Sequence, residues 1–243
     1  MIQQWNYWLT QDLGINLLTA ENTFLSNALV EQYGKHILLI GVPEQSQLLN
    51  CSVIPNKILL TSLFNKHTYS KCIESEYYDL PIAPGSIDIV ILPHLLEFID
   101  NPHRLLTEAC RIVKPEGFII IFGFNPTSLW GLKKWWMKSK TMPWNGSFLK
   151  PKVIKHWLKL ADFELFKHDM LLFRPPLLHS VWYEKLKWLD SIGKKLYAPF
   201  GGVYVLTAQA KTTALTPIKL HWKQKLAALH TPIPRPTMRD MHN

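Results

Sequence analysis

Five apolar runs in the first half of the chain have the length and composition of strands. Residues 36–41 (HILLIG), 86–92 (SIDIVIL) and 118–124 (FIIIFGF) are almost unbroken, and weaker runs stand at 57–61 and 71–73. Runs without alternation are typical of strands whose two faces are both covered by helices. The pattern therefore predicts buried parallel strands.

Segments with helical spacing separate these strands. Residues 1–14 form a short amphipathic segment, and apolar residues repeat at helical spacing in 19–34 and 101–113. Thr19 is expected to be the N-cap of the helix over 19–34, with Glu21 in its first turn. Strands that alternate with helices predict an α/β fold built on a doubly wound parallel sheet.

The second half of the chain is rich in Trp and Lys. Its patterns predict helices at 128–139, 151–161 and 179–197 and strands at 163–173 and 203–210. Beyond Lys211 the chain has four prolines, few large apolar residues and excess positive charge. We therefore expect one domain over residues 1–211 and a basic, mostly disordered tail over 212–243.

The net charge of +9 is unevenly distributed. Residues 1–127 contain 7 Lys and Arg against 12 Asp and Glu, residues 128–210 contain 14 against 5, and residues 211–243 contain 6 against 1. A basic second half favours an anionic partner such as RNA, acidic lipid or an acidic protein. General solubility is the alternative explanation.

Other sequence features narrow the class of protein. Cys51, Cys72 and Cys110 are widely spaced, which predicts buried free thiols in a reducing compartment. The N-terminus lacks the basic start and apolar run of a signal peptide, and no apolar stretch reaches 18 residues. These features predict a cytoplasmic chain without a transmembrane span, with peripheral membrane association left open. Hydrolase, metalloprotease, P-loop and dinucleotide motifs are missing, and the ten histidines have no metal-ligand spacing.

A specific resemblance begins at residues 79–126, DLPIAPGSIDIVILPHLLEFIDNPHRLLTEACRIVKPEGFIIIFGFNP. The order L-P-I, S-I-D-I-V and R-I-V-K-P-E-G resembles class I S-adenosylmethionine-dependent methyltransferases of the type 11 branch. Further matches, such as GFNP at 123–126 and GGVYV at 201–205, point to a bacterial subgroup with an incomplete glycine loop. The resemblance implies a Rossmann-like sheet of seven strands in the order 3-2-1-4-5-7-6, with the last strand antiparallel. It also implies S-adenosylmethionine as cofactor, bound over the carboxyl ends of strands one to four.

The glycine loop departs from the family pattern. The family's G-x-G-x-G aligns with Gly41, Pro43 and Gln45, so only the first glycine is kept. Gly41 either lets the backbone approach the cofactor or serves a tight turn. Pro43 lacks an N–H donor, and Gln45 adds bulk where the chain should pass close to ligand. The family's acidic residue at the end of strand two is replaced by Thr61, a neutral cofactor-binding candidate, followed by Ser62.

Further cofactor-binding candidates follow strands three and four. The resemblance places Glu76 and Asp79 where the family contacts the adenine amino group, although two solvated loop acids would look the same. Pro93 follows strand four, where the family places cofactor and substrate contacts.

His94, Glu97 and Asn125 are the candidate catalytic and substrate residues. The unperturbed pKa of histidine, ~6.5, suits a general base, so His94 after strand four is a candidate for that role. The alternative is that His94 only starts a helix or fills the core. Glu97 and Asn125 are expected to contact substrate at the same mouth. For Asn125 a strand-ending turn is the alternative.

Two predicted helices alternate aromatic residues with lysines. The first contains Trp130, Trp135 and Trp136 with Lys133, Lys134 and Lys138. Such a mixture stacks bases or sits at a lipid interface, or else the tryptophans cap the sheet while the lysines reach water. We favour the structural explanation, in which the tryptophans cap the sheet and the lysines reach water.

The resemblance implies an S-adenosylmethionine-dependent methyltransferase acting on an unidentified methyl acceptor. Because the loop is incomplete, the alternative is a non-catalytic methyltransferase-like domain that binds a partner through its basic surface.

Overall fold

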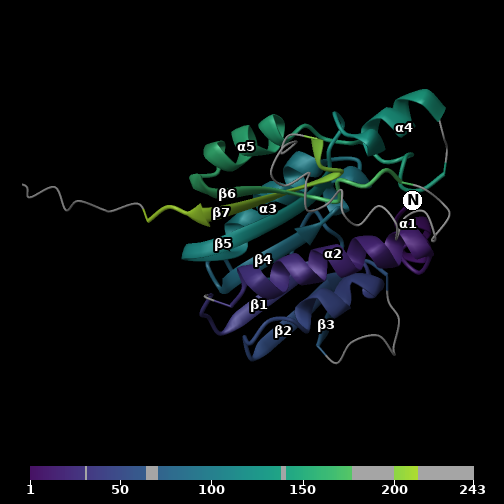
Figure 1. Cartoon of the computed structure of the whole chain (residues 1–243). Coiled ribbons are helices and arrows are strands. Elements are labelled where there is room, and N and C mark those ends of the chain that lie inside the picture. The colour runs from purple at the N-terminus through teal and green to yellow at the C-terminus, as the bar shows by residue number, and fades with distance from the viewer. Residues whose placement is uncertain (31, 64–70, 138–140, 177–199, 213–243) are drawn as a thin grey trace, which may run out of the picture. The chain divides into compact units, whose positions relative to one another are not determined.

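The computed structural model describes residues 1–30, 32–63, 71–137, 141–176 and 200–212 (Figure 1). Residues 1–212 form one compact unit. The helix expected at 179–197 and the tail expected beyond 212 lie outside the described residues. Among the helices of the described ranges, none is long and apolar enough to cross a bilayer.

A seven-stranded sheet in the order β3-β2-β1-β4-β5-β7-β6 forms the centre of the unit. Its strands are β1 (His36–Ile40), β2 (Asn56–Thr61), β3 (Cys72–Glu74), β4 (Ile87–Pro93), β5 (Val113–Phe124), β6 (Phe163–Leu171) and β7 (Val203–Ala210). The strands β1 to β5 pair in parallel, whereas β7 runs antiparallel to both β5 and β6. The predicted fold class and strand order are confirmed.

Helices cover both faces of this sheet. They are α1 (Ile2–Trp8), α2 (Asp12–Ala28), α3 (Pro102–Ile112), α4 (Leu129–Met137) and α5 (Pro151–Leu160), with the 3-10 helices η1 (Pro43–Leu49) and η2 (Leu95–Glu97). Figure 1 shows α2 along one face, and α3 and α5 over the other.

The strand β1 shows why its sequence is an unbroken apolar run. Ile37 and Leu39 pack into the apolar cluster that contains the buried residues of α1 and α2, whereas Leu38 and Ile40 pack into the cluster that contains those of α3 and α5. Successive side chains of a strand point to opposite faces. Both faces are therefore buried.

Three expectations about local structure are wrong. The helix α2 begins at Asp12, so Thr19 is interior and its hydroxyl donates to the carbonyl of Ile15 at 2.7 Å. Of the three free thiols only that of Cys110 is buried, and Cys72 is exposed. The carboxylate of Glu21, expected in a first turn, lies fully buried in the middle of α2.

Candidate functional site

An open hollow of about 510 Å³ lies at the carboxyl ends of β2, β3 and β4. It is lined by Met1, Ile2, Gln3, Ser62, Leu63, Glu76, Tyr77, Tyr78, Phe98, Ile99 and Asp100. The order 3-2-1-4 reverses direction between β1 and β4, and ligands of open α/β sheets bind beside such a switch point. The hollow therefore has the place of a ligand site.

Polar groups from three strand ends meet in this hollow. Ser62 follows β2, Glu76 follows β3, and Asp100 follows η2 beyond β4. The neighbouring Tyr78 hydroxyl accepts from the backbone N–H of Asn101 at 3.1 Å. Carboxylates and hydroxyls accept hydrogen bonds from amino and hydroxyl groups, and the rings supply apolar surface. This combination of hydrogen-bond acceptors and aromatic rings fits a nucleoside.

The space beside Gly41 is filled by the protein itself. Gln45 is fully buried; its Oε1 accepts from the N–H of Val42 at 3.0 Å, and its Nε2 donates to the carbonyl of Pro93 at 2.9 Å. A Cβ at Gly41 would collide with the Gln45 amide. Gly41 is thus needed for the approach of Gln45.

The hydroxyl of Tyr77 closes the other side of Gly41. It donates to the Gly41 carbonyl at 3.0 Å and accepts from the N–H of Ser62 at 3.1 Å. Tyr77 thereby links the ends of β1 and β2. Gln45 and Tyr77 together fill the space beside Gly41, and of these two residues Tyr77 also lines the hollow.

Pro43 serves the local structure of the loop. It starts η1, where a missing N–H costs no hydrogen bond. The N–H of the next residue, Glu44, donates to the side-chain oxygen of Asn6 at 3.1 Å and so ties the loop to α1.

Thr61 and Asp79 also lie outside the lining of the hollow. Thr61 is buried, and its hydroxyl accepts from the N–H of Leu63 at 3.1 Å, which shapes the turn that presents Ser62 and Leu63. Asp79 is exposed, whereas Glu76 lines the hollow. Of the cofactor-binding candidates, the structure brings only Glu76 to the hollow.

His94 lies fully buried between two carboxylates. Its Nε2 is 2.7 Å from Oε1 of Glu21, and its Nδ1 is 3.1 Å from Oε2 of Glu97. The backbone of His94 has φ 57°, a left-handed conformation that turns the chain sharply after β4. The rings of Trp5 and Phe124 pack against the imidazole, at centroid distances of 5.6 and 4.1 Å.

The two carboxylates determine the protonation of His94. Burial by itself would lower the pKa of the imidazole, but the charge and hydrogen bond of Glu21, together with those of Glu97, raise it to about 9. At neutral pH the ring is therefore an imidazolium with both nitrogens engaged. Burial also raises the pKa of the Glu97 carboxyl, against the opposing charge of His94.

Glu97 and Asn125 hold strand ends together. Oε1 of Glu97 accepts from the N–H of Phe124, at the end of β5, at 2.5 Å. The side-chain N–H of Asn125 donates to the carbonyl of Gly201 at 3.0 Å, and its oxygen accepts from Thr127. Both side chains are buried and neither lines the hollow.

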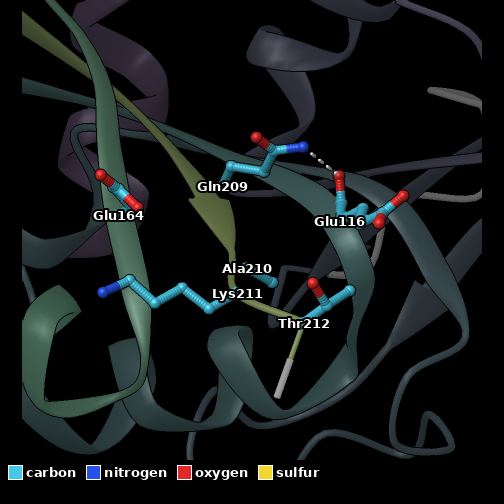
Figure 2. Close-up of a pocket in the computed structure, with 6 residues that line it drawn as sticks. All are labelled: Glu116, Glu164, Gln209, Ala210, Lys211 and Thr212. Carbon is cyan, nitrogen blue, oxygen red and sulfur yellow. Dashed lines mark hydrogen bonds between the residues drawn. The ribbon is translucent and has the colours of Figure 1, made fainter. Parts of the chain in front are cut away.

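A second hollow, of about 480 Å³, lies where β7 ends and β6 begins (Figure 2). It is lined by Glu116, Glu164, Gln209, Ala210, Lys211 and Thr212. Gln209 donates to the carbonyl of Glu116 at 3.0 Å, which closes one side of it. Its lining shares no residue with the sequence-predicted site.

Sequence reasoning missed Glu21, Tyr77 and Asp100. The burial of Glu21 could have been predicted, because Glu21 stands four residues from both Leu17 and Leu25 and so lies on the buried stripe of α2. A buried acid on such a stripe demands a partner. No sequence pattern indicates the roles of Tyr77 and Asp100, because these roles depend on which strand ends the fold brings together.

A family model described as a methyltransferase domain matches residues 45–121. The protein YafS of Escherichia coli strain K12, described as an uncharacterized protein, is 30% identical over 192 residues, which cover 76% of this chain and 72% of that relative. The matched segment contains the hollow's residues Ser62, Glu76 and Asp100 within it.

Solved structures share the fold. An S-adenosylmethionine-dependent methyltransferase from Thermotoga maritima matches with a TM-score of 0.60 at 19% identity, over 80% of this chain and 89% of that one. A Haloferax volcanii chain described as a methyltransferase, solved in complex with the activator Trm112, matches with a TM-score of 0.61 at 13% identity, over 87% and 97%.

Proposed function

The chain belongs to the class I S-adenosylmethionine-dependent methyltransferases of the type 11 branch, and from this premise we propose that it methylates an acceptor at the hollow beside β2, β3 and β4. The observation that carries the proposal is the convergence of Ser62, Glu76 and Asp100 at the switch point of a methyltransferase sheet. We assign this activity to residues 1–211.

S-adenosylmethionine is the cofactor of this family, and the residues present fit its adenosine part. The hydroxyl of Ser62, after β2, suits a ribose hydroxyl, and the carboxylate of Glu76, after β3, suits the adenine amino group that the resemblance assigns to it, while Asp100 adds a second carboxylate to the same hollow. The cofactor supplies an activated methyl group on a sulfonium. The protein then needs chiefly to bind, orient and exclude water, so the site needs no nucleophile–base pair, and the described lining of the hollow contains none.

His94 acts in this proposal as a positioning residue. Its imidazolium joins α2, through Glu21, to the end of β4, while Glu97 joins the same group to β5. The general-base role expected for His94 stays a prediction. In the described conformation both ring nitrogens contact carboxylates, so neither is free to take a proton from the methyl acceptor.

Calorimetric titration with S-adenosylhomocysteine tests the proposal. We expect binding in the micromolar range, weakened about tenfold in Glu76→Gln because a charged hydrogen bond is lost. Glu74→Gln is the matched control, since Glu74 is an exposed acid on β3 outside the lining. Equal affinities of the two variants would refute the assignment of Glu76.

The second candidate function is a non-catalytic partner-binding domain. The observation that favours it is the occupation of the glycine loop by Gln45 and Tyr77. This alternative predicts no heat of binding at millimolar S-adenosylmethionine or S-adenosylhomocysteine. Micromolar binding would reject it.

The proposal also covers the binding partner of the protein and its location in the cell. The basic second half of the chain supports an anionic partner, which is RNA, acidic lipid or an acidic protein. We also propose that the protein is cytoplasmic and associates peripherally with a membrane. Binding to such a partner weakens as salt rises. Binding that is independent of salt would reject the electrostatic part of the proposal.

A further inference from the structure

The helix α4 exposes several large apolar residues and partly buries its lysines, which is the reverse of the usual arrangement. Leu129, Leu132, Trp135 and Trp136, which we call the α4 surface, are exposed, with the two tryptophans 77% and 80% exposed. Its lysines, Lys133 and Lys134, are half-buried. A solvent-facing helix normally does the opposite, with apolar residues inward and lysines outward.

The lysines of α4 are held by the protein. Nζ of Lys133 donates to the carbonyl of Pro176 at 2.9 Å and lies 4.1 Å from the centre of the Trp144 ring. Nζ of Lys134 donates to the carbonyl of Gly146 and lies 4.5 Å from the centre of the Phe148 ring. Burial lowers the pKa of both ammonium groups. Both side chains therefore point away from the α4 surface.

The α4 surface is continuous and apolar. Leu129, Leu132 and Trp136 stand at i, i+3 and i+7, so they share one face of the helix, and Trp135 flanks it. Trp130 points inward instead, stacked on Phe124 at a centroid distance of 5.5 Å. Contiguous exposed apolar residues mark interaction sites, and Trp prefers the interface between water and lipid.

The sequence that contains α4 is basic, which favours an anionic partner. Between Ser128 and Ala161 it has no Asp or Glu and eight lysines, two of which, Lys133 and Lys134, are the lysines held on the protein. Lys150 and Lys152 are exposed, and Lys150 follows closely after Phe148, whose ring lies under Lys134. Each Lys near an anionic bilayer surface contributes about 1 kcal/mol of attraction.

We propose that α4 docks the protein on an anionic lipid bilayer, with Leu129, Leu132, Trp135 and Trp136 inserted among the headgroups. RNA fits this surface less well, because stacking sites for bases need cations directed outward between the aromatic rings. The aliphatic Leu129 and Leu132 also suit acyl chains better than bases. The inference does not depend on methyl transfer.

Vesicle flotation with the full chain tests the proposal. We expect binding to phosphatidylcholine–phosphatidylglycerol vesicles in 50 mM salt, and at least about tenfold weaker partitioning onto pure phosphatidylcholine vesicles. The double variant Trp135→Ser and Trp136→Ser should lose about tenfold or more of the partitioning, because two interfacial anchors are removed. A thermal melt shows whether this variant remains folded.

The matched control is the double variant Tyr33→Ser and Phe166→Ser, which removes two exposed aromatic side chains elsewhere. It should bind vesicles as the unchanged chain does. The proposal is overturned if the unchanged chain stays unbound, or if both double variants bind equally. It is also overturned if Trp135 and Trp136 serve only RNA binding or self-association, which an RNA titration and light scattering would show.

Discussion

His94 ties the protonation of one side chain to the stability of the fold. The imidazole is fully buried, and Glu21 and Glu97 occupy both of its nitrogens. Removing one partner of such a buried pair leaves a charge without compensation, which typically costs about 3–5 kcal/mol. The group is thus a structural joint between α2 and the ends of β4 and β5.

The raised pKa of His94 predicts lower stability at alkaline pH. The folded pKa of about 9 exceeds the unfolded value of 6.5, so this contribution is fully present below pH 6.5 and is lost as pH rises through about 9. The shift corresponds to about 3 kcal/mol of unfolding free energy. Urea unfolding at pH 6.5 and pH 9.5 measures the loss.

The variant Glu21→Gln isolates this contribution. It keeps the size of the side chain but removes the largest charge acting on His94, so the alkaline loss should shrink. The buried Tyr204 and Cys110, whose pKa values burial raises, also destabilise the fold at high pH, but they are present in both proteins. An unchanged alkaline loss in Glu21→Gln would contradict the assignment.

At the scale of elements, the N-terminal helices depend on close backbone packing. Gly14 lies in the first turn of α2, where a Cβ would collide with the carbonyl of Trp8 and the backbone of Leu9. This contact lets α1 turn back, so that Trp5 stacks on Phe98 and Met1 to Gln3 line the hollow. The sequence between the two helices therefore controls one wall of the site.

Gly14→Ala should destabilise the protein despite the better helix propensity of Ala. The propensity gain is about 1 kcal/mol, whereas overpacking against backbone atoms costs about 1–3 kcal/mol and displaces α1. Thermal unfolding should therefore begin at a lower temperature. An unchanged or higher melting temperature would show that α1 accommodates the methyl group.

Thr19→Ala is the control on the same helix. Thr19 is exposed and interior to α2, so the replacement should change stability by only a few tenths of a kcal/mol. A loss near 1 kcal/mol would instead be the signature of the N-cap that the sequence suggested.

The elements were more predictable than their ends. Apolar periodicity located β1, β2, β3, β4 and β7 closely, because buried strands repeat a local pattern, but β5 begins at Val113, five residues before its predicted start. It misplaced the start of α2 by seven residues, since Thr19 and Glu21 look like a first turn while the true start, at Asp12, follows α1 after only three residues. Tertiary packing there overrides a local capping signal.

At the scale of the whole molecule, the sheet could be predicted and most of the site could not. The motif at 79–126 resembles one family closely enough to fix the strand order. The Glu21–His94 pair, in contrast, joins residues 73 positions apart, and the Tyr77–Gly41 bond joins residues 36 apart. Local patterns carry no signal for such pairs. The bulk of Gln45 in the glycine loop was predicted from the sequence, whereas the hydrogen bond of Tyr77 to Gly41 was not.

The arrangement of the unit predicts how it would lie on a bilayer. Figure 1 shows α1 and α4 beyond the same end of the sheet, and the strand β7 ends at the opposite side. The hollow at Ser62 and Glu76 shares the end with α1, whereas the hollow at Glu116 and Gln209 lies at the end of β7. A bilayer that binds α4 therefore approaches the first hollow and stays away from the second.

Hydrogen exchange with anionic vesicles measures this orientation. Amides of α4 and α1 should exchange more slowly when vesicles are added, because the bilayer excludes water from them. Amides near Glu116, Glu164 and Gln209 should exchange at the same rate with and without vesicles, which makes them an internal control. Slowing of exchange at both ends would indicate a general tightening of the fold, and slowing only at the end of β7 would place the bilayer on the wrong side of the molecule.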